Sequence, residues 1–207
     1  MQIVFKPWTF DPFLTLGTLS LVERKLKMTV SEPYEKAIDA WVTFSNGVQR
    51  SLSGLWKNAP LFLVFLRHFG WPFCREQAVQ LQRSKERFED NGFQVVLVGL
   101  GTSDRAEAFK KQFNISFPII CDPEKKLYQT YGLGRSSVAR MASPAFLLKG
   151  LKALSQGHLP GVPRDDVMQM PGVFLIDTSG NIRYAHYSKD PSDNPSIETL
   201  LELKEIF

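Results

Sequence analysis

The sequence is poor in the residues that cross-link proteins or bind metals. Its 207 residues include two cysteines and three histidines. Two cysteines exclude a disulfide-rich scaffold and a zinc site built from cysteines of this chain alone. The histidines His68, His158 and His186 are not spaced as H-x-x-x-H. A helical metal site is therefore not expected, and we assign no metal ligand.

Long apolar runs are also missing. The longest uninterrupted one covers residues 61–66, whereas a membrane helix needs about 18 or more apolar residues. We therefore expect no membrane span. Hydrophobic residues nevertheless make up 43% of the chain and charged residues 22%. These shares are close to the average of globular proteins, so the chain can bury a core.

Neither sign of charge dominates. The 25 Lys and Arg residues are mixed with 21 Asp and Glu residues, and the net charge is +4. No run of basic residues suggests contacts to phosphates, so nucleic-acid binding is not expected. The glycines Gly99 and Gly101 follow a predicted strand, but the third glycine of a dinucleotide fingerprint is missing. A P-loop is absent too, so no cofactor is expected.

The first residues do not form a secretory signal. Pro7, Asp11 and Pro12 interrupt the apolar residues there, whereas a signal peptide needs a continuous apolar stretch and a small-residue cleavage site. We therefore expect a cytoplasmic protein with free thiols. We interpret residues 1–39 as an N-terminal extension and residues 40–207 as a single domain.

Hydrophobic periodicity and turn residues predict the elements of the first half. Alternation on both sides of Asn46-Gly47 predicts a β-hairpin over residues 41–52, whose two turn residues would both have positive φ. Residues 61–66 predict a strand covered on both faces. Residues 74–91 follow with helical spacing, and Asn91-Gly92 ends the helix.

The second half continues as alternating strands and helices. Ser103 and Asp104 are candidates for the N-cap of its first helix. The pattern predicts strands over residues 93–100, 117–121, 172–177 and 182–186, and helices over residues 103–113, 124–131, 144–156 and 197–206.

The order of these elements defines the expected fold. An N-terminal β-hairpin precedes alternating strands and helices, and an antiparallel hairpin and a closing helix end the chain. Strands joined through helices pair in parallel, and helices then cover both faces of the sheet. We predict an α/β protein of the thioredoxin-like class, with a central mixed sheet flanked by helices on both faces.

Several segments carry a resemblance to a known family. They are LRHFGWPFCRE at residues 66–76, FPIICDPE at 117–124, LYQTYGL at 127–133 and MPGVFLID at 170–177. In this order they resemble the peroxiredoxin-like subfamily of the AhpC/TSA group, over roughly residues 40–207. The resemblance implies a thioredoxin fold and an antioxidant, thiol-based oxidoreductase activity.

Cys74 is the candidate nucleophile. It is predicted in the first turn of a helix, directly after a buried strand. Helix N-termini carry partial positive charge and unpaired N–H groups, and both stabilise a thiolate. Thiols at such positions can have pKa values lowered to about 3.5–7.5. Arg67 and Arg75 are candidates to stabilise the thiolate and to polarise a peroxide. The other hypothesis is a buried, inert cysteine.

The motif departs from those of related families. Trp71-Pro72-Phe73-Cys74 replaces the C-x-x-C of thioredoxins, so a local dithiol is impossible. Arg67 and Trp71 occupy the positions of the Pro and Thr in the P-x-x-x-T-x-x-C motif of typical peroxiredoxins. Pro171 stands where these enzymes have an Arg, and where thioredoxins have a cis-proline that faces the active cysteine. Trp71, Pro72, Phe73 and Pro171 are the expected substrate pocket.

Cys121 is the second thiol. It follows a predicted strand and precedes Asp122-Pro123. It is a candidate resolving cysteine, but nothing local activates it, and the alternative is a structural residue. His68 is a candidate base beside Cys74, with a structural histidine as the alternative.

The sequence is compatible with three functions. The first is a one-cysteine peroxidase, in which Cys74 reduces a peroxide and an external thiol such as thioredoxin or glutathione regenerates it. The second is reduction of lipid endoperoxides, against which the missing first cysteine counts. The third is a catalytically decayed binding module with a thioredoxin fold. A homodimer is compatible with the resemblance, because two-fold pairing is the commonest oligomer.

Overall fold

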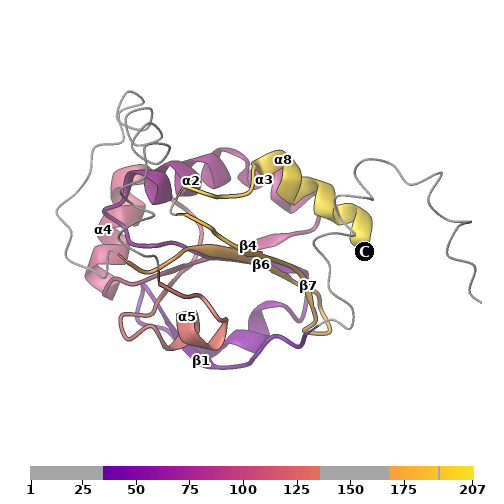
Figure 1. Ribbon diagram of the computed structural model, residues 1–207, viewed down its shortest axis with the longest axis horizontal. Helices are drawn as coiled ribbons and strands as arrows, with labels where there is room; N and C mark the ends of the chain where they lie inside the picture. The colour runs from indigo at the N-terminus through magenta and orange to yellow at the C-terminus, as the bar shows by residue number, and fades with distance from the viewer. Residues whose placement is uncertain (1–34, 136–167, 191) are drawn as a thin grey trace, which may run out of the picture.

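The computed structural model describes residues 35–135, 168–190 and 192–207. Seven strands form one sheet in the order β2-β1-β5-β4-β3-β6-β7 (Figure 1). The strands are β1 (Trp41–Phe44), β2 (Gln49–Ser51), β3 (Leu61–Phe65), β4 (Gln94–Gly99), β5 (Ile119–Cys121), β6 (Gly172–Ile176) and β7 (Ile182–Tyr187). The helices are η1 (Leu52–Leu55), α2 (Pro72–Arg83), α3 (Lys85–Asp90), α4 (Ser103–Phe113), α5 (Lys126–Thr130), α8 (Ile197–Glu202) and η2 (Leu203–Ile206).

The strand directions confirm the predicted mixed sheet. β3, β4 and β5 run parallel, with α2, α3 and α4 in the connections between them. β6 is antiparallel to β3, β7 is antiparallel to β6, and β1 is antiparallel to β5. The carboxyl ends of the three parallel strands therefore meet at one edge of the sheet. This is the edge at which ligands bind in α/β proteins.

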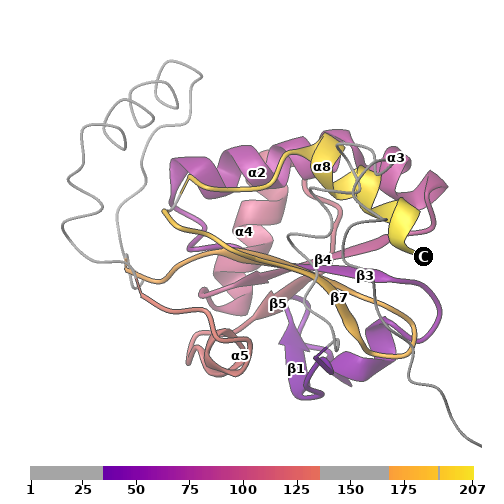
Figure 2. The same ribbon diagram turned by 45° about the vertical axis from the view of Figure 1, so that its right-hand side comes forward.

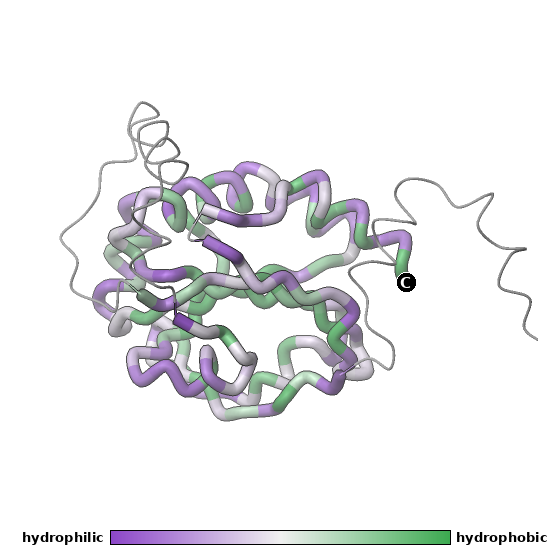
Figure 3. Tube along the Cα trace, viewed as in Figure 1, coloured by the Kyte–Doolittle hydropathy of each residue, from purple (hydrophilic) through white to green (hydrophobic). Residues whose placement is uncertain are grey.

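Two apolar layers flank the sheet, because successive side chains of a strand point to opposite faces. Phe62 and Val64 of β3 pack in the layer formed with α2, α3, α4 and α8. Leu63 and Phe65 pack in the opposite layer, with η1 and α5. Figure 2 shows α2, α3 and α8 on one side of the sheet and α5 on the other. The helices on both faces confirm the predicted thioredoxin-like class, and the most hydrophobic stretches follow the central strands (Figure 3).

The N-terminal hairpin forms as predicted, but its turn differs. Gly47 has a φ of 82°, whereas Asn46 does not have a positive φ. The N–H of Gly47 donates to the carbonyl of Phe44 at 2.9 Å, and the Asn46 side chain accepts from the N–H of Val48 at 3.1 Å. The hydrogen-bonded turn therefore spans residues 44–47, one residue earlier than the predicted turn centred on Asn46-Gly47. Only Gly47 needs the left-handed conformation.

Two helix predictions need correction. The helix expected over residues 74–91 is two helices, α2 and α3, because Ser84 leaves the helical region with φ −102° and ψ 11°. The N-cap of α4 is Thr102, while Ser103 and Asp104 are its first helical residues. Pro72 does begin α2, and Gly92 follows α3 with a φ of 75°. The helix predicted over residues 144–156 lies outside the described residues.

Residues before the first strand contact the far edge of the sheet. The N–H of Ala37 donates to the carbonyl of Gly180, and the N–H of Ile182 donates to the carbonyl of Glu35, both at 2.8 Å. The described part of the extension is thus tied to the β6–β7 turn, and the boundary at residue 39 stays a prediction. Among the described helices, none combines the length and the apolar character needed to cross a membrane.

Candidate functional site

Cys74 lies in the first turn of α2, at the carboxyl edge of β3. Trp71 precedes the helix in an extended conformation, with φ −86° and ψ 130°. Pro72 follows as a first-turn residue, where its missing N–H costs no helical hydrogen bond. The Gly-Trp-Pro sequence therefore turns the chain out of the sheet and places Cys74 beside the end of β3, as the sequence predicted.

The sulfur of Cys74 faces the backbone of the segment that leaves β3. The N–H of Arg67 donates to Sγ at 3.2 Å. The side chain is only 1% exposed. Burial raises the pKa of the Cys74 thiol, because it outweighs the backbone N–H groups of His68 and Arg67 and the charges of Arg67 and Arg75, which lower it. The expected lowered pKa is therefore wrong for this conformation, although both arginines act in the expected direction.

Arg67 is buried completely, with 0% of its surface exposed. Its guanidinium carbon lies 4.4 Å from the centre of the Trp71 ring. This cation–π geometry gives Trp71 a defined contact, which a Thr at this position would not provide. His68 is buried as well, and its ring centre lies 5.7 Å from that of Trp71.

Arg75 lies on the outer side of the same turn. Its Nε donates to the carbonyl of Phe69 at 3.2 Å, and its guanidinium carbon lies 5.3 Å from the centre of the Phe113 ring. Arg75 therefore links the start of α2 to the preceding loop and to α4. It is only partly buried, unlike Arg67.

Phe69 fixes the loop between β3 and α2. A Cβ added to Gly99 or Gly101 would lie 2.4 or 2.5 Å from the Phe69 ring. These two glycines therefore leave the space that the ring fills at the end of β4. The ring also packs against Phe109 of α4, with ring centres 4.9 Å apart.

Tyr128 is a residue that the sequence analysis missed. It belongs to α5, on the face of the sheet opposite Cys74, and it is completely buried. Its hydroxyl donates to the carbonyl of Leu66 and lies 3.1 Å from the carbonyl of Val98. The segment LYQTYGL contributed to the resemblance, but no pattern in it indicated a contact with the Cys74 loop.

The four residues expected to form a substrate pocket differ in their exposure. Pro72, Phe73 and Pro171 are buried, and only Trp71 is partly exposed. Pro171 precedes Gly172, which pairs with Phe65 of β3. Pro171 therefore lies at the same edge of the sheet as Cys74, as the resemblance implied. A cis peptide before it stays a prediction.

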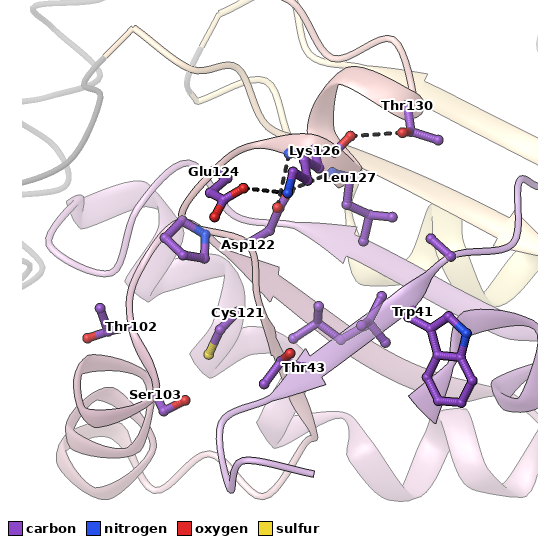
Figure 4. A pocket seen from close by; sticks show the side chains of 14 residues that line it. Trp41, Thr43, Thr102, Ser103, Cys121, Asp122, Glu124, Lys126, Leu127 and Thr130 are labelled. Atoms are coloured by element: carbon purple, nitrogen blue, oxygen red, sulfur yellow. Dashed lines mark hydrogen bonds and ion pairs between the residues drawn. The ribbon is translucent and has the colours of Figure 1, made fainter. Parts of the chain in front are cut away.

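An open pocket of about 500 Å³ lies beside Cys121. Figure 4 shows Cys121 between Ser103, at the start of α4, and Thr43 of β1. Burial raises the pKa of the half-buried Cys121 thiol, and the charge of Glu107 adds to this, while a hydrogen bond from the Ser103 side chain lowers it. The other lining residues are Ala40, Trp41, Val42, Thr102, Ile120, Asp122, Pro123, Glu124, Lys126, Leu127 and Thr130.

The two thiols lie on the same face of the sheet, since Cys121 packs against the apolar layer that contains Cys74. Both cysteines are free. Cys121 ends β5, which is two strands away from β3, a spacing of roughly 9.5 Å. The two cysteines come from different elements, β5 and α2, and a role of Cys121 as a resolving cysteine stays a prediction. Among the described residues, His, Cys, Asp and Glu side chains form no group of three that could hold a metal ion.

The fold and the site define a class of protein: a thioredoxin-like α/β protein with one cysteine in the first turn of α2. The AhpC/TSA antioxidant enzyme family model matches residues 80–190, more than half of the chain. The chain belongs to this family. The matched region begins after Cys74, so the resemblance around the cysteine adds to the family match and is not part of it.

Similar proteins agree with this family. The chain is 28% identical over 165 residues to the thioredoxin-like protein AAED1, chloroplastic, of Arabidopsis thaliana, covering 75% of this chain and 66% of that protein, just under two thirds of its length. It is 25% identical over 161 residues to the prostamide/prostaglandin F synthase of Danio rerio, covering 75% of this chain and 79% of that protein.

Solved structures share the fold. The peroxidoxin BcpB from Mycobacterium tuberculosis superposes with a TM-score of 0.64 at 17% identity, covering 86% of this chain and 98% of that one. A yeast mitochondrial 1-Cys peroxiredoxin superposes with a TM-score of 0.60 at 13% identity, covering 81% and 72%. Family membership supports a function among the thiol oxidoreductases.

Proposed function

We propose that this protein is a thiol peroxidase that reduces peroxides through Cys74 alone and is regenerated by an external thiol. The main observation behind this proposal is the position of the Cys74 sulfur in the first turn of α2, where it accepts a hydrogen bond from the N–H of Arg67 at 3.2 Å. N–H donors that point at a sulfur favour the negative charge of a thiolate. The positive charges of Arg67 and Arg75 act in the same direction on this sulfur.

The chemistry runs in three steps. The Cys74 thiolate attacks one oxygen of the peroxide and breaks the O–O bond, giving a sulfenic acid, and the other oxygen leaves as an alcohol or water after protonation. An external thiol then attacks the sulfenic sulfur, and water leaves as the mixed disulfide forms. A second external thiol reduces this disulfide and restores the Cys74 thiol.

Regeneration of Cys74 needs a reducing thiol. We propose a reductant from outside the chain, because Trp71 takes the place of the first cysteine of a C-x-x-C motif and no local dithiol can form with Cys74. The yeast mitochondrial 1-Cys peroxiredoxin with the same fold is resolved through the glutathione and thioredoxin systems. We propose a reductant of this kind, in a reducing compartment such as the cytoplasm, since both thiols are free.

Burial of Cys74 imposes a condition on this mechanism. A thiol that is 1% exposed cannot meet a peroxide without movement of the residues above it. Trp71 is partly exposed and lies in the loop before α2, so its ring and this loop are the expected moving part. Local openings of this kind occur in native proteins at less than the cost of global unfolding.

The same burial favours a second candidate, a binding module with a thioredoxin fold whose site has decayed. One experiment separates the two. Peroxide consumption is measured with dithiothreitol as reductant, for wild type, Cys74→Ser and Cys121→Ser. The proposal expects loss of activity in Cys74→Ser and retention in Cys121→Ser. If wild type consumes peroxide no faster than Cys74→Ser, Cys74 has no part in peroxide reduction, and the binding module remains.

A further inference from the structure

One peptide group connects Tyr128 with Cys74. The carbonyl of Leu66 accepts the hydroxyl of Tyr128, and the N–H of Arg67 donates to the sulfur of Cys74. This carbonyl and this N–H belong to the same peptide bond, since Arg67 follows Leu66. Tyr128 lies in the apolar layer on one face of the sheet and Cys74 in the layer on the other. The hydrogen bonds therefore cross the sheet at the end of β3.

A peptide bond transmits such a contact. Its carbonyl and N–H share one resonance system, which keeps the group planar. When the oxygen accepts a hydrogen bond, electron density moves toward it and the N–H becomes a stronger donor. The strengthened donor favours the charged form of the sulfur. This effect needs neither contact between Tyr128 and Cys74 nor movement of the backbone.

We propose that Tyr128 is a positioning residue for Cys74, because its hydroxyl polarises the Leu66–Arg67 peptide that donates to the sulfur. The inference rests on the proposed chemistry at Cys74 and adds a residue from the opposite face of the sheet. Arg67, which follows β3, and Arg75, from α2, are the charged groups that act on the sulfur, and the backbone N–H of His68 also favours its charged form. On the other side, the Asp122 carboxylate accepts the backbone N–H of Tyr128 at 3.1 Å. Replacing the tyrosine by phenylalanine retains all of these groups.

The test compares Tyr128→Phe with a matched control. Tyr131→Phe also removes one buried hydroxyl from the same apolar layer, but this hydroxyl contacts the carbonyl of Ile38 at 3.4 Å. Cysteine labelled with ¹³C at Cβ is titrated by NMR in both variants and in wild type, and Cys74→Ser assigns the Cys74 resonance. Chemical denaturation of each variant measures stability separately.

The expected result is specific to Tyr128. Tyr128→Phe raises the midpoint of the Cys74 titration and leaves about two- to fourfold less thiolate at a fixed pH below the midpoint. Tyr131→Phe leaves the midpoint where it is in wild type. 3-Fluorotyrosine at position 128 is a stronger hydrogen-bond donor than tyrosine, so its incorporation should lower the midpoint of the Cys74 titration. This measurement tests the inference even if Tyr128→Phe does not fold.

Other outcomes overturn the inference. If Tyr128→Phe lowers stability but does not move the midpoint, Tyr128 is only a structural residue. Equal shifts in both phenylalanine variants also contradict it. The proposed function fails separately, through equal peroxide consumption by wild type and Cys74→Ser, because the titration does not depend on turnover.

Discussion

The guanidinium of Arg67 stacks on the indole of Trp71, with its central carbon 4.4 Å from the ring centre. Arg67 is completely buried, so this contact holds a cation beside Cys74 inside the protein. The Trp that replaces the hydroxyl residue of typical peroxiredoxins thus has a structural partner of its own. A movement of the Trp71 ring therefore also changes the surroundings of the Arg67 guanidinium, whose charge acts on Cys74.

We therefore expect Trp71→Leu to be more harmful than Trp71→Phe. Leucine removes the cation–π contact, whereas phenylalanine retains an aromatic face, so the leucine variant should lose about 1–2 kcal/mol of unfolding free energy and the phenylalanine variant less. Urea denaturation at neutral pH measures this. Trp41→Leu is the control, because the Trp41 side chain is 79% exposed and its loss should change stability by less than about 0.5 kcal/mol. Equal losses in both Trp71 variants would show that the stack contributes nothing.

Gly99→Ala should disturb the Cys74 loop from β4. The added methyl would lie 2.4 Å from the Phe69 ring, so the ring must move, at a cost of about 1–3 kcal/mol. Denaturation of the variant measures the cost. Gly54→Ala is the matched control, because no atom lies within 4 Å of its added Cβ. Combining Gly99→Ala with Phe69→Leu should recover part of the loss, and an unchanged loss in the double variant would contradict the assignment to Phe69.

The sequence predicts the fold well because the fold depends on local patterns. The apolar run of β3, Pro72 at the start of α2 and the glycine after α3 each determine their own segment. Errors arise where two adjacent residues compete for one role. Thr102 takes the N-cap that Ser103 and Asp104 were expected to provide.

The candidate site is harder to predict from local sequence patterns. The position of Cys74 follows from local sequence, but its burial depends on residues that lie far away along the chain. The hydroxyl of Tyr128 reaches Leu66 across 62 positions, and the ring of Phe69 packs against Gly99 across 30. Periodicity reports which face a residue occupies and not which backbone group its hydroxyl contacts. The helix terminus and the neighbouring arginines predict a lowered pKa for Cys74, and the burial that raises it depends on these distant contacts.

The two thiols should differ in reaction with bulky reagents. Cys121 opens on a pocket of about 500 Å³, whereas Cys74 is 1% exposed. A maleimide should therefore modify Cys121 at least about tenfold faster than Cys74 in the folded protein, since Cys74 reacts only after local opening. Peptide mass spectrometry measures both sites in one sample, and labelling in urea should remove the difference. Faster labelling of Cys74 in the folded state would contradict its burial.

Stability at alkaline pH should depend on Cys74. Burial raises the pKa of its thiol in the folded state, whereas a cysteine of the unfolded chain has a pKa of about 8.5. Such a group stabilises the fold fully below the unfolded pKa, and this contribution is lost as the pH rises toward the folded pKa, because only the unfolded state releases its proton. The unfolding free energy should therefore fall between about pH 8.5 and pH 10, before the phenols of the unfolded chain ionise near about pH 10.

Urea denaturation of wild type and Cys74→Ser across this pH interval measures the contribution of the Cys74 thiol to the unfolding free energy. Serine does not ionise here, so the stability difference between the two proteins should shrink steadily as the pH rises. Cys121→Ser is the matched control and should retain most of the pH dependence, because its thiol is only half-buried. If Cys74→Ser shows the same slope as wild type, the Cys74 thiol ionises in the folded protein as readily as in the unfolded chain. The sulfur would then be far better hydrated than its position in the apolar layer under α2 implies.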